Sequence, residues 1–175
     1  MWEVASWRAA GVLSGPQEEV AGLAFSPDGR LMAAACARGR VVIWETRTGR
    51  VAHVLEEEGQ SFLDVAFHPD GSLLAATTWG PEIRLFNVAD WSPRGTLLGP
   101  HAGSRHVEFS PDGELLFLTR FGFLALSLAE GSRVFRHEVD NDFYGSSVAP
   151  SPDGTLVAWG EPDGTVGLWG AATSG

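Results

Sequence analysis

The chain has 175 residues, of which 44% are hydrophobic, and it carries a formal net charge of -10 at pH 7. This hydrophobic fraction is typical of a globular protein that buries a core, whereas the negative charge argues against nucleic acid or an anionic membrane surface as the main partner. Cys36 is the single cysteine, which excludes an internal disulfide and, with no pattern typical of a signal peptide or a membrane span, predicts a cytoplasmic location.

A turn motif recurs along the chain. It reads Ser-Pro-Asp-Gly at 26–29, 110–113 and 151–154 and His-Pro-Asp-Gly at 68–71, so that successive prolines are 42, 42 and 41 residues apart. Seventeen positions after the four prolines stand Trp44, Phe86, Leu128 and Trp169. Trp2 lies 42 residues before Trp44. A period of this length indicates a repeat protein, with units of about 1–44, 45–86, 87–128 and 129–175 in a single module.

Each unit is predicted to contain short strands in a fixed order, separated by turns that use proline and glycine. The predicted first strands are 20–25, 62–67 and 104–109, and the second strands are 31–35, 73–77, 115–119 and 156–159. The predicted third strands are 41–44, 83–86, 124–128 and 166–169, and fourth strands begin at Arg50 and Arg133. Short strands at this spacing indicate repeated four-stranded antiparallel sheets.

The segments 20–29 and 41–45 resemble the WD40 repeat, and the resemblance extends over nearly the whole chain. It implies an all-β fold, a β-propeller of four WD40-like four-stranded antiparallel blades whose strands a to d follow the chain order. A propeller of the TolB kind, which also carries Ser-Pro-Asp-Gly turns, is the alternative on the same residues.

The two ends of the chain fall at complementary points of the repeat. The first full strand, about residues 8–13, corresponds to strand d, while the last unit ends after strand c at Trp169. We therefore expect the N-terminal strand to complete the last blade or to pair with another chain, which protects a sheet edge. Three arrangements follow: a closed four-bladed ring, half of an eight-bladed ring made by two chains, or part of a larger propeller.

Polar residues alternate along the predicted first strands. Because alternate residues of a strand share a surface and strand a is innermost in a propeller, Asp64, His106 and Glu108 are predicted to line a central channel. The alternative is an axial site for a divalent cation or for proton transfer. These residues have no metal-ligand spacing and the chain has no phosphate-binding loop, so neither a metal nor another cofactor is expected.

The loops between strands d and a and between strands b and c are predicted to share one face, which is rich in acidic and aromatic residues. Exposed aromatic side chains are typical anchors of protein interfaces, and an acidic face favours a basic partner. The predicted partner-binding residues are Arg38, Glu56, Glu57, Glu58, Trp79, Phe121, Phe143, Tyr144 and Asp163.

The resemblance implies a non-catalytic scaffold that presents propeller loops to a protein or peptide. We expect no enzymatic activity, because the chain contains no recognisable nucleophile motif. Two alternatives stay open at this point: a structural half-ring that assembles with another copy or with its parent chain, and a propeller enzyme or metal site on the central axis.

Overall fold

The computed structural model describes residues 2–3, 8–9, 13, 15, 18–99, 103–120, 122–138 and 147–170. The regular secondary structure of these residues consists of β-strands. No helix in this part of the chain has the length and hydrophobicity that crossing a membrane requires. The predicted all-β architecture is confirmed.

Four antiparallel sheets follow one another along the chain, and each contains one of the recurrent Pro-Asp-Gly turns. Blade one contains β3 (Val20–Phe25), β4 (Leu31–Cys36), β5 (Arg40–Glu45) and β6 (Val51–Glu56). Blade two contains β7 (Phe62–Phe67), β8 (Leu73–Thr78), β9 (Glu82–Asn87) and β10 (Pro93–Leu98). Blade three contains β11 (His106–Phe109), β12 (Leu115–Thr119), β13 (Gly122–Ser127) and β14 (Arg133–Glu138). Blade four contains β15 (Val148–Pro150), β16 (Leu156–Gly160) and β17 (Val166–Gly170).

The recurrent Pro-Asp-Gly motif forms the turn between the first two strands of each blade. In blade three, the Ser110 hydroxyl donates to Asp112 Oδ1 at 2.5 Å and accepts from the Leu115 N–H at 2.9 Å. The Glu114 N–H also donates to Asp112 Oδ1, at 3.0 Å. Gly113 has a φ of 77°, a conformation that favours glycine. The motif recurs because each of its residues satisfies or permits part of this turn.

In blade two, histidine replaces the serine of the turn. His68 Nδ1 lies 2.6 Å from Asp70 Oδ1, and its Nε2 lies 3.1 Å from the Gly113 carbonyl oxygen of blade three. The ring also packs edge-on against Phe109, with 5.1 Å between the ring centroids. The substitution therefore keeps the turn and adds a link to the next blade.

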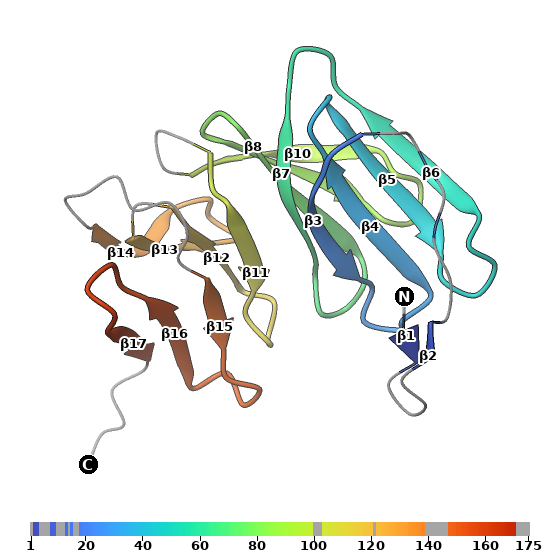
Figure 1. The fold of residues 1–175 in the computed structure, drawn as a ribbon. Helices are drawn as coiled ribbons and strands as arrows, with labels where there is room; N and C mark the ends of the chain where they lie inside the picture. The colour runs from blue at the N-terminus through green and yellow to red at the C-terminus, as the bar shows by residue number, and fades with distance from the viewer. Residues whose placement is uncertain are drawn as a thin grey trace.

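Blades one to four stand side by side in an open arc, with blade one at one end and blade four at the other (Figure 1). The inner strands β3, β7, β11 and β15 are neighbours from blade to blade. Each pair of neighbouring blades buries an apolar cluster between them, represented by Ile43 with Phe62, Ile83 with Leu116, and Phe123 with Val157. Because blades one and four lie at the two ends of the arc, the prediction of a closed four-bladed ring is wrong for this structure. The other two arrangements stay predictions.

The register of the sheets corrects one assignment in blade three. In blades one, two and four, a large aromatic side chain of the third strand lies opposite the second residue of the second strand. These residues are Trp44, Phe86 and Trp169. In blade three Leu126 takes this place, opposite Leu116, so the assignment of Leu128 is wrong. The cause is a connection two residues shorter when it is measured from equivalent positions. Thr119 pairs with Phe123, four positions on, whereas the equivalent Ala35 and Thr77 each pair with a residue six positions on, Val41 and Ile83.

The N-terminal residues occupy the blade-one end of the arc. β1 (Trp2–Glu3) pairs with β2 (Arg8–Ala9), and Leu13 packs against a buried cluster of blade one that includes Met32 and Trp44. Within the described residues β17 borders only β16, so the N-terminal strand does not complete blade four in this chain. Pairing with another chain stays a prediction.

The turn motif carries a stability prediction. Replacing Ser110 by alanine is expected to lower the free energy of unfolding by about 1–2 kcal/mol, because the partly buried Leu115 N–H loses its acceptor, the hydroxyl of the buried Ser110. Chemical denaturation followed by tryptophan fluorescence measures the change. Ser151→Ala is the matched control, since the equivalent turn of blade four is solvent-exposed and should lose less. Equal losses at both positions would contradict the explanation.

Candidate functional site

Trp79 is a large exposed hydrophobic residue in the turn between β8 and β9. Its indole remains 58% exposed, although its backbone is held from both sides. The Trp79 N–H donates to the Ser61 carbonyl oxygen, and the Gly103 N–H donates to the Trp79 carbonyl oxygen, each at 2.9 Å. A Cβ at Gly103 would collide with the carbonyl oxygen of Thr78, so only glycine permits this close approach. The side chain is therefore exposed on a fixed backbone.

The guanidinium group of a buried arginine makes a cation–π contact with the indole ring of Trp79. The Arg120 guanidinium lies 5.5 Å from the centroid of the Trp79 ring, and its Nη1 donates to the Gly103 carbonyl oxygen at 2.6 Å. Arg120 itself is buried, so the cation–π contact is strengthened by desolvation. We call Trp79, Gly103 and Arg120 the Trp79 platform. It joins the turns of blades two and three.

The acidic residues of the loop that leads to Ser61, whose carbonyl oxygen accepts from the Trp79 N–H, are partly neutralised by arginines. Arg84 Nε donates to Glu57 Oε2 at 2.9 Å, and Arg84 Nη2 lies 3.2 Å from Glu82 Oε2. Arg40 bridges Glu56 at 3.0 Å and Glu18 at 2.6 Å. Glu58 is exposed and belongs to neither pair.

The remaining predicted partner-binding residues fall into two groups. Arg38 is exposed in the turn between β4 and β5, and Asp163 is exposed in the turn between β16 and β17. Asp163 Oδ1 accepts from the Thr165 hydroxyl at 2.6 Å and from its N–H at 2.9 Å, and these bonds lower the pKa of the Asp163 carboxyl. Phe121, Phe143 and Tyr144 lie outside the described residues.

Asp64 and His106, two of the predicted channel residues, meet between neighbouring inner strands. Asp64 Oδ2 lies 3.1 Å from His106 Nδ1 and accepts from the Val107 N–H at 3.0 Å. Asp64 also packs so closely against Gly22 of blade one that a Cβ there would collide with its carboxyl group. One buried carboxylate thus links three blades.

Glu108 lines the same cavity of about 210 Å³ as Asp64 and His106, along the inner strands. The hydrogen bond that His106 donates to Asp64 raises the pKa of His106 above its ordinary value, and burial raises the pKa of Glu108. No three carboxylate, histidine or cysteine side chains among the described residues are grouped as metal ligands would be. The geometry supports a linkage between blades more directly than a cation site.

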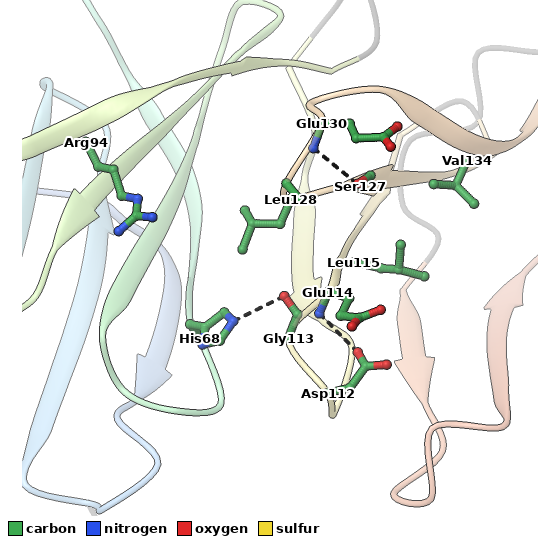
Figure 2. A pocket seen from close by; sticks show the side chains of 11 residues that line it. His68, Arg94, Asp112, Gly113, Glu114, Leu115, Ser127, Leu128, Glu130 and Val134 are labelled. Carbon is green, nitrogen blue, oxygen red and sulfur yellow. Dashed lines mark hydrogen bonds between the residues drawn. The ribbon is translucent and has the colours of Figure 1, made fainter.

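A larger cavity of about 670 Å³ lies between blades two and three, beside the turns that join the first and second strands of these blades (Figure 2). His68 and Arg94 line it from blade two, while Asp112, Glu114 and Glu130 contribute acidic groups from blade three. Apolar residues, among them Leu128 and Val134, line the cavity together with these charged groups. Ser127 also lines the cavity, and its Oγ accepts from the Glu130 N–H at 3.3 Å.

Sequence reasoning missed the two arginines that neutralise the acidic loops. Arg40 and Arg84 belong to β5 and β9, and their long side chains reach residues far apart in the sequence. The available signal was Arg84 itself, which interrupts an apolar strand between Ile83 and Leu85. A charged residue within such a strand requires a partner.

Comparison with known families agrees with the repeat architecture. Residues 2–64 match the model described as the anaphase-promoting complex subunit 4 WD40 domain. Residues 49–87 match the model described as the WD domain, G-beta repeat. A search of curated proteins found no match. WD40 repeats generally mediate protein–protein interactions, and the two matches agree with the blade geometry and the recurrent turns: residues 2–87 carry WD40-family repeats, and blades three and four continue the same architecture.

Proposed function

We propose that the chain is a non-catalytic interaction scaffold that binds a protein or peptide through the loop face around the Trp79 platform. The observation that carries the proposal is the 58% exposure of the Trp79 indole on a backbone fixed by two neighbouring loops. An aromatic side chain that is already ordered loses little conformational freedom when a partner covers it.

The charges around the platform support a basic partner segment. The chain has a net charge of -10, and Glu58 is exposed in the loop that also carries Glu57. Arg120 is buried beneath the indole and Arg84 is engaged by two carboxylates. A partner with an apolar side chain for Trp79 and basic groups nearby therefore fits this surface.

The proposal is tested with a displayed library of random peptides selected against the full chain. Replacing Trp79 by alanine is expected to weaken binding of the selected peptides on the order of 30-fold, the effect of a hot-spot residue worth about 2 kcal/mol. Fluorescence polarisation with labelled peptides measures the dissociation constants. The variant keeps the backbone contacts of residue 79 but loses the cation–π contact with Arg120, so its thermal unfolding midpoint should fall, and binding is compared at a temperature where circular dichroism shows both chains folded.

Leu98→Ala is the matched control, since Leu98 is an equally exposed apolar residue on β10. Peptide binding that falls with Trp79→Ala and not with Leu98→Ala supports the proposed surface. Selected peptides that bind both variants as tightly as the original chain would assign binding to another face.

A further inference from the structure

The outer face of blade four exposes side chains that the other blades bury. Val166 is 66% exposed and Leu168 is 64% exposed. Their equivalents by position in the repeat are Ile83 and Leu85 in blade two, and both of these are buried against blade three. Blade four therefore has the face of a blade that is followed by another blade.

At the opposite end of the arc, blade one exposes apolar side chains on its innermost strand. Leu23 is 60% exposed and Phe25 is 56% exposed on the innermost strand of blade one. The equivalent residues of blade two, Val65 and Phe67, are buried against blade one. Blade one therefore has the face of a blade that is preceded by another.

We propose that the outer face of blade four binds blade one of a second copy of this chain, head to tail. We choose a second copy as the partner because one chain carries both halves of the interface that neighbouring blades form. Blade four exposes the residues that blade two packs against blade three, and blade one exposes the residues that blade two packs against blade one. Val166 and Leu168 of one copy would cover Leu23 and Phe25 of the next. This surface is distinct from the Trp79 platform, and the proposal does not rest on the proposed function.

The N-terminal strands show how blade one would receive the second copy. Trp2 pairs with Ala9 in the same spacing as Trp44 with Val51, where strands c and d of blade one meet. Leu13 lies against Gly49 as Leu97, from the fourth strand of blade two, lies against Gly131. The N-terminal segment thus holds the place of a fourth strand before blade one.

Blade four lacks the strand that this segment offers. In the part of the chain that the structure describes, β17 pairs with β16 alone, so its other edge has no partner strand. Docking of the two copies would place the open edge of β17 beside β2 of the second copy, in the position that β1 occupies within one chain. The backbone groups of that edge and the apolar face of blade four would be covered in the same contact.

The first test is the mass of the purified full chain in solution, measured by light scattering across a range of concentrations. We expect a mass of at least two chains of 18.7 kDa each. Leu168→Asp and Phe25→Asp should each weaken the association at least about tenfold. Leu98→Asp, at an exposed position on neither face, should leave it unchanged. A mass of one chain at all concentrations would overturn the proposal.

The second test distinguishes a head-to-tail contact from a contact between two like faces. The Leu168→Asp and Phe25→Asp variants are each expected to remain monomeric when alone, with the circular dichroism of the original chain. A mixture of the two contains one undamaged pair of faces, so it should form a mixed dimer. Failure of the folded variants to associate in the mixture would contradict head-to-tail binding, as would equal association of every variant.

Discussion

Replacing Phe123 by alanine is expected to lower the free energy of unfolding by about 3–5 kcal/mol, the usual cost of removing a buried phenylalanine side chain. Phe123 is almost fully buried at the interface of blades three and four. Its ring stacks on Trp159 with 4.7 Å between the centroids and an interplanar angle of 11°. Phe117, Phe135 and Trp169 surround the same ring at 5.7 to 6.1 Å.

The loss should be concentrated in blade four. Among the described strands, β15 to β17 are attached to the rest of the molecule through blade three, and in repeat proteins stability is carried by the contacts between neighbours. Hydrogen exchange should show lost protection in residues 148–170 before residues 20–98 are affected. Phe62→Ala, at the interface of blades one and two, is the matched control because it should affect the other end of the arc. Equal loss of protection throughout the chain after Phe123→Ala would contradict this attachment.

The turn motif allowed the blades to be predicted from the sequence, because its chemistry is local. Ser26, Asp28 and the N–H groups that follow them interact within five residues, so the pattern is complete in a short stretch of chain. The same applies to the alternation of side chains on the inner strands. That alternation placed Asp64 and His106 on one surface, and the side-by-side arrangement of blades two and three brings them into contact.

Features that depend on several segments could not be predicted in the same way. The shortened turn of blade three moves Leu126 into the position expected for Leu128, and a count from proline cannot distinguish two leucines two positions apart. The ion pairs of Arg40 and Arg84 depend on side-chain reach across strands and loops. The exposed state of Trp79 depends on which loops hold its backbone, and those loops belong to both neighbouring blade junctions.

The second large effect is expected at the buried carboxylate that links the inner strands. Replacing Asp64 by alanine should lower the free energy of unfolding by about 3 kcal/mol, since the buried Val107 N–H and His106 both lose a charged acceptor. Denaturant titration at pH 6 measures the loss. His106→Gln removes one of the two contacts and keeps the bond to Val107, so its effect should be smaller. A loss as large with His106→Gln as with Asp64→Ala would place the stabilisation in the histidine alone.

The same carboxylate should give the protein a defined dependence on pH. Its hydrogen bond to His106 raises the pKa of the folded imidazole above the ordinary value of 6.5, so the folded state binds a proton more tightly than the unfolded chain. The resulting stabilisation is complete below pH 6.5 and is lost as the pH rises through the raised pKa. Burial raises the pKa of Glu108 above 4.5, which has the same sign and begins at lower pH. Asp64→Ala should therefore reduce the fall in stability as the pH rises above 6.5, while leaving most of the fall that Glu108 causes as the pH rises above 4.5. A variant whose stability falls as steeply as that of the original chain above pH 6 would show that the blades are joined here by packing and the Val107 bond, without a contribution from the charged histidine.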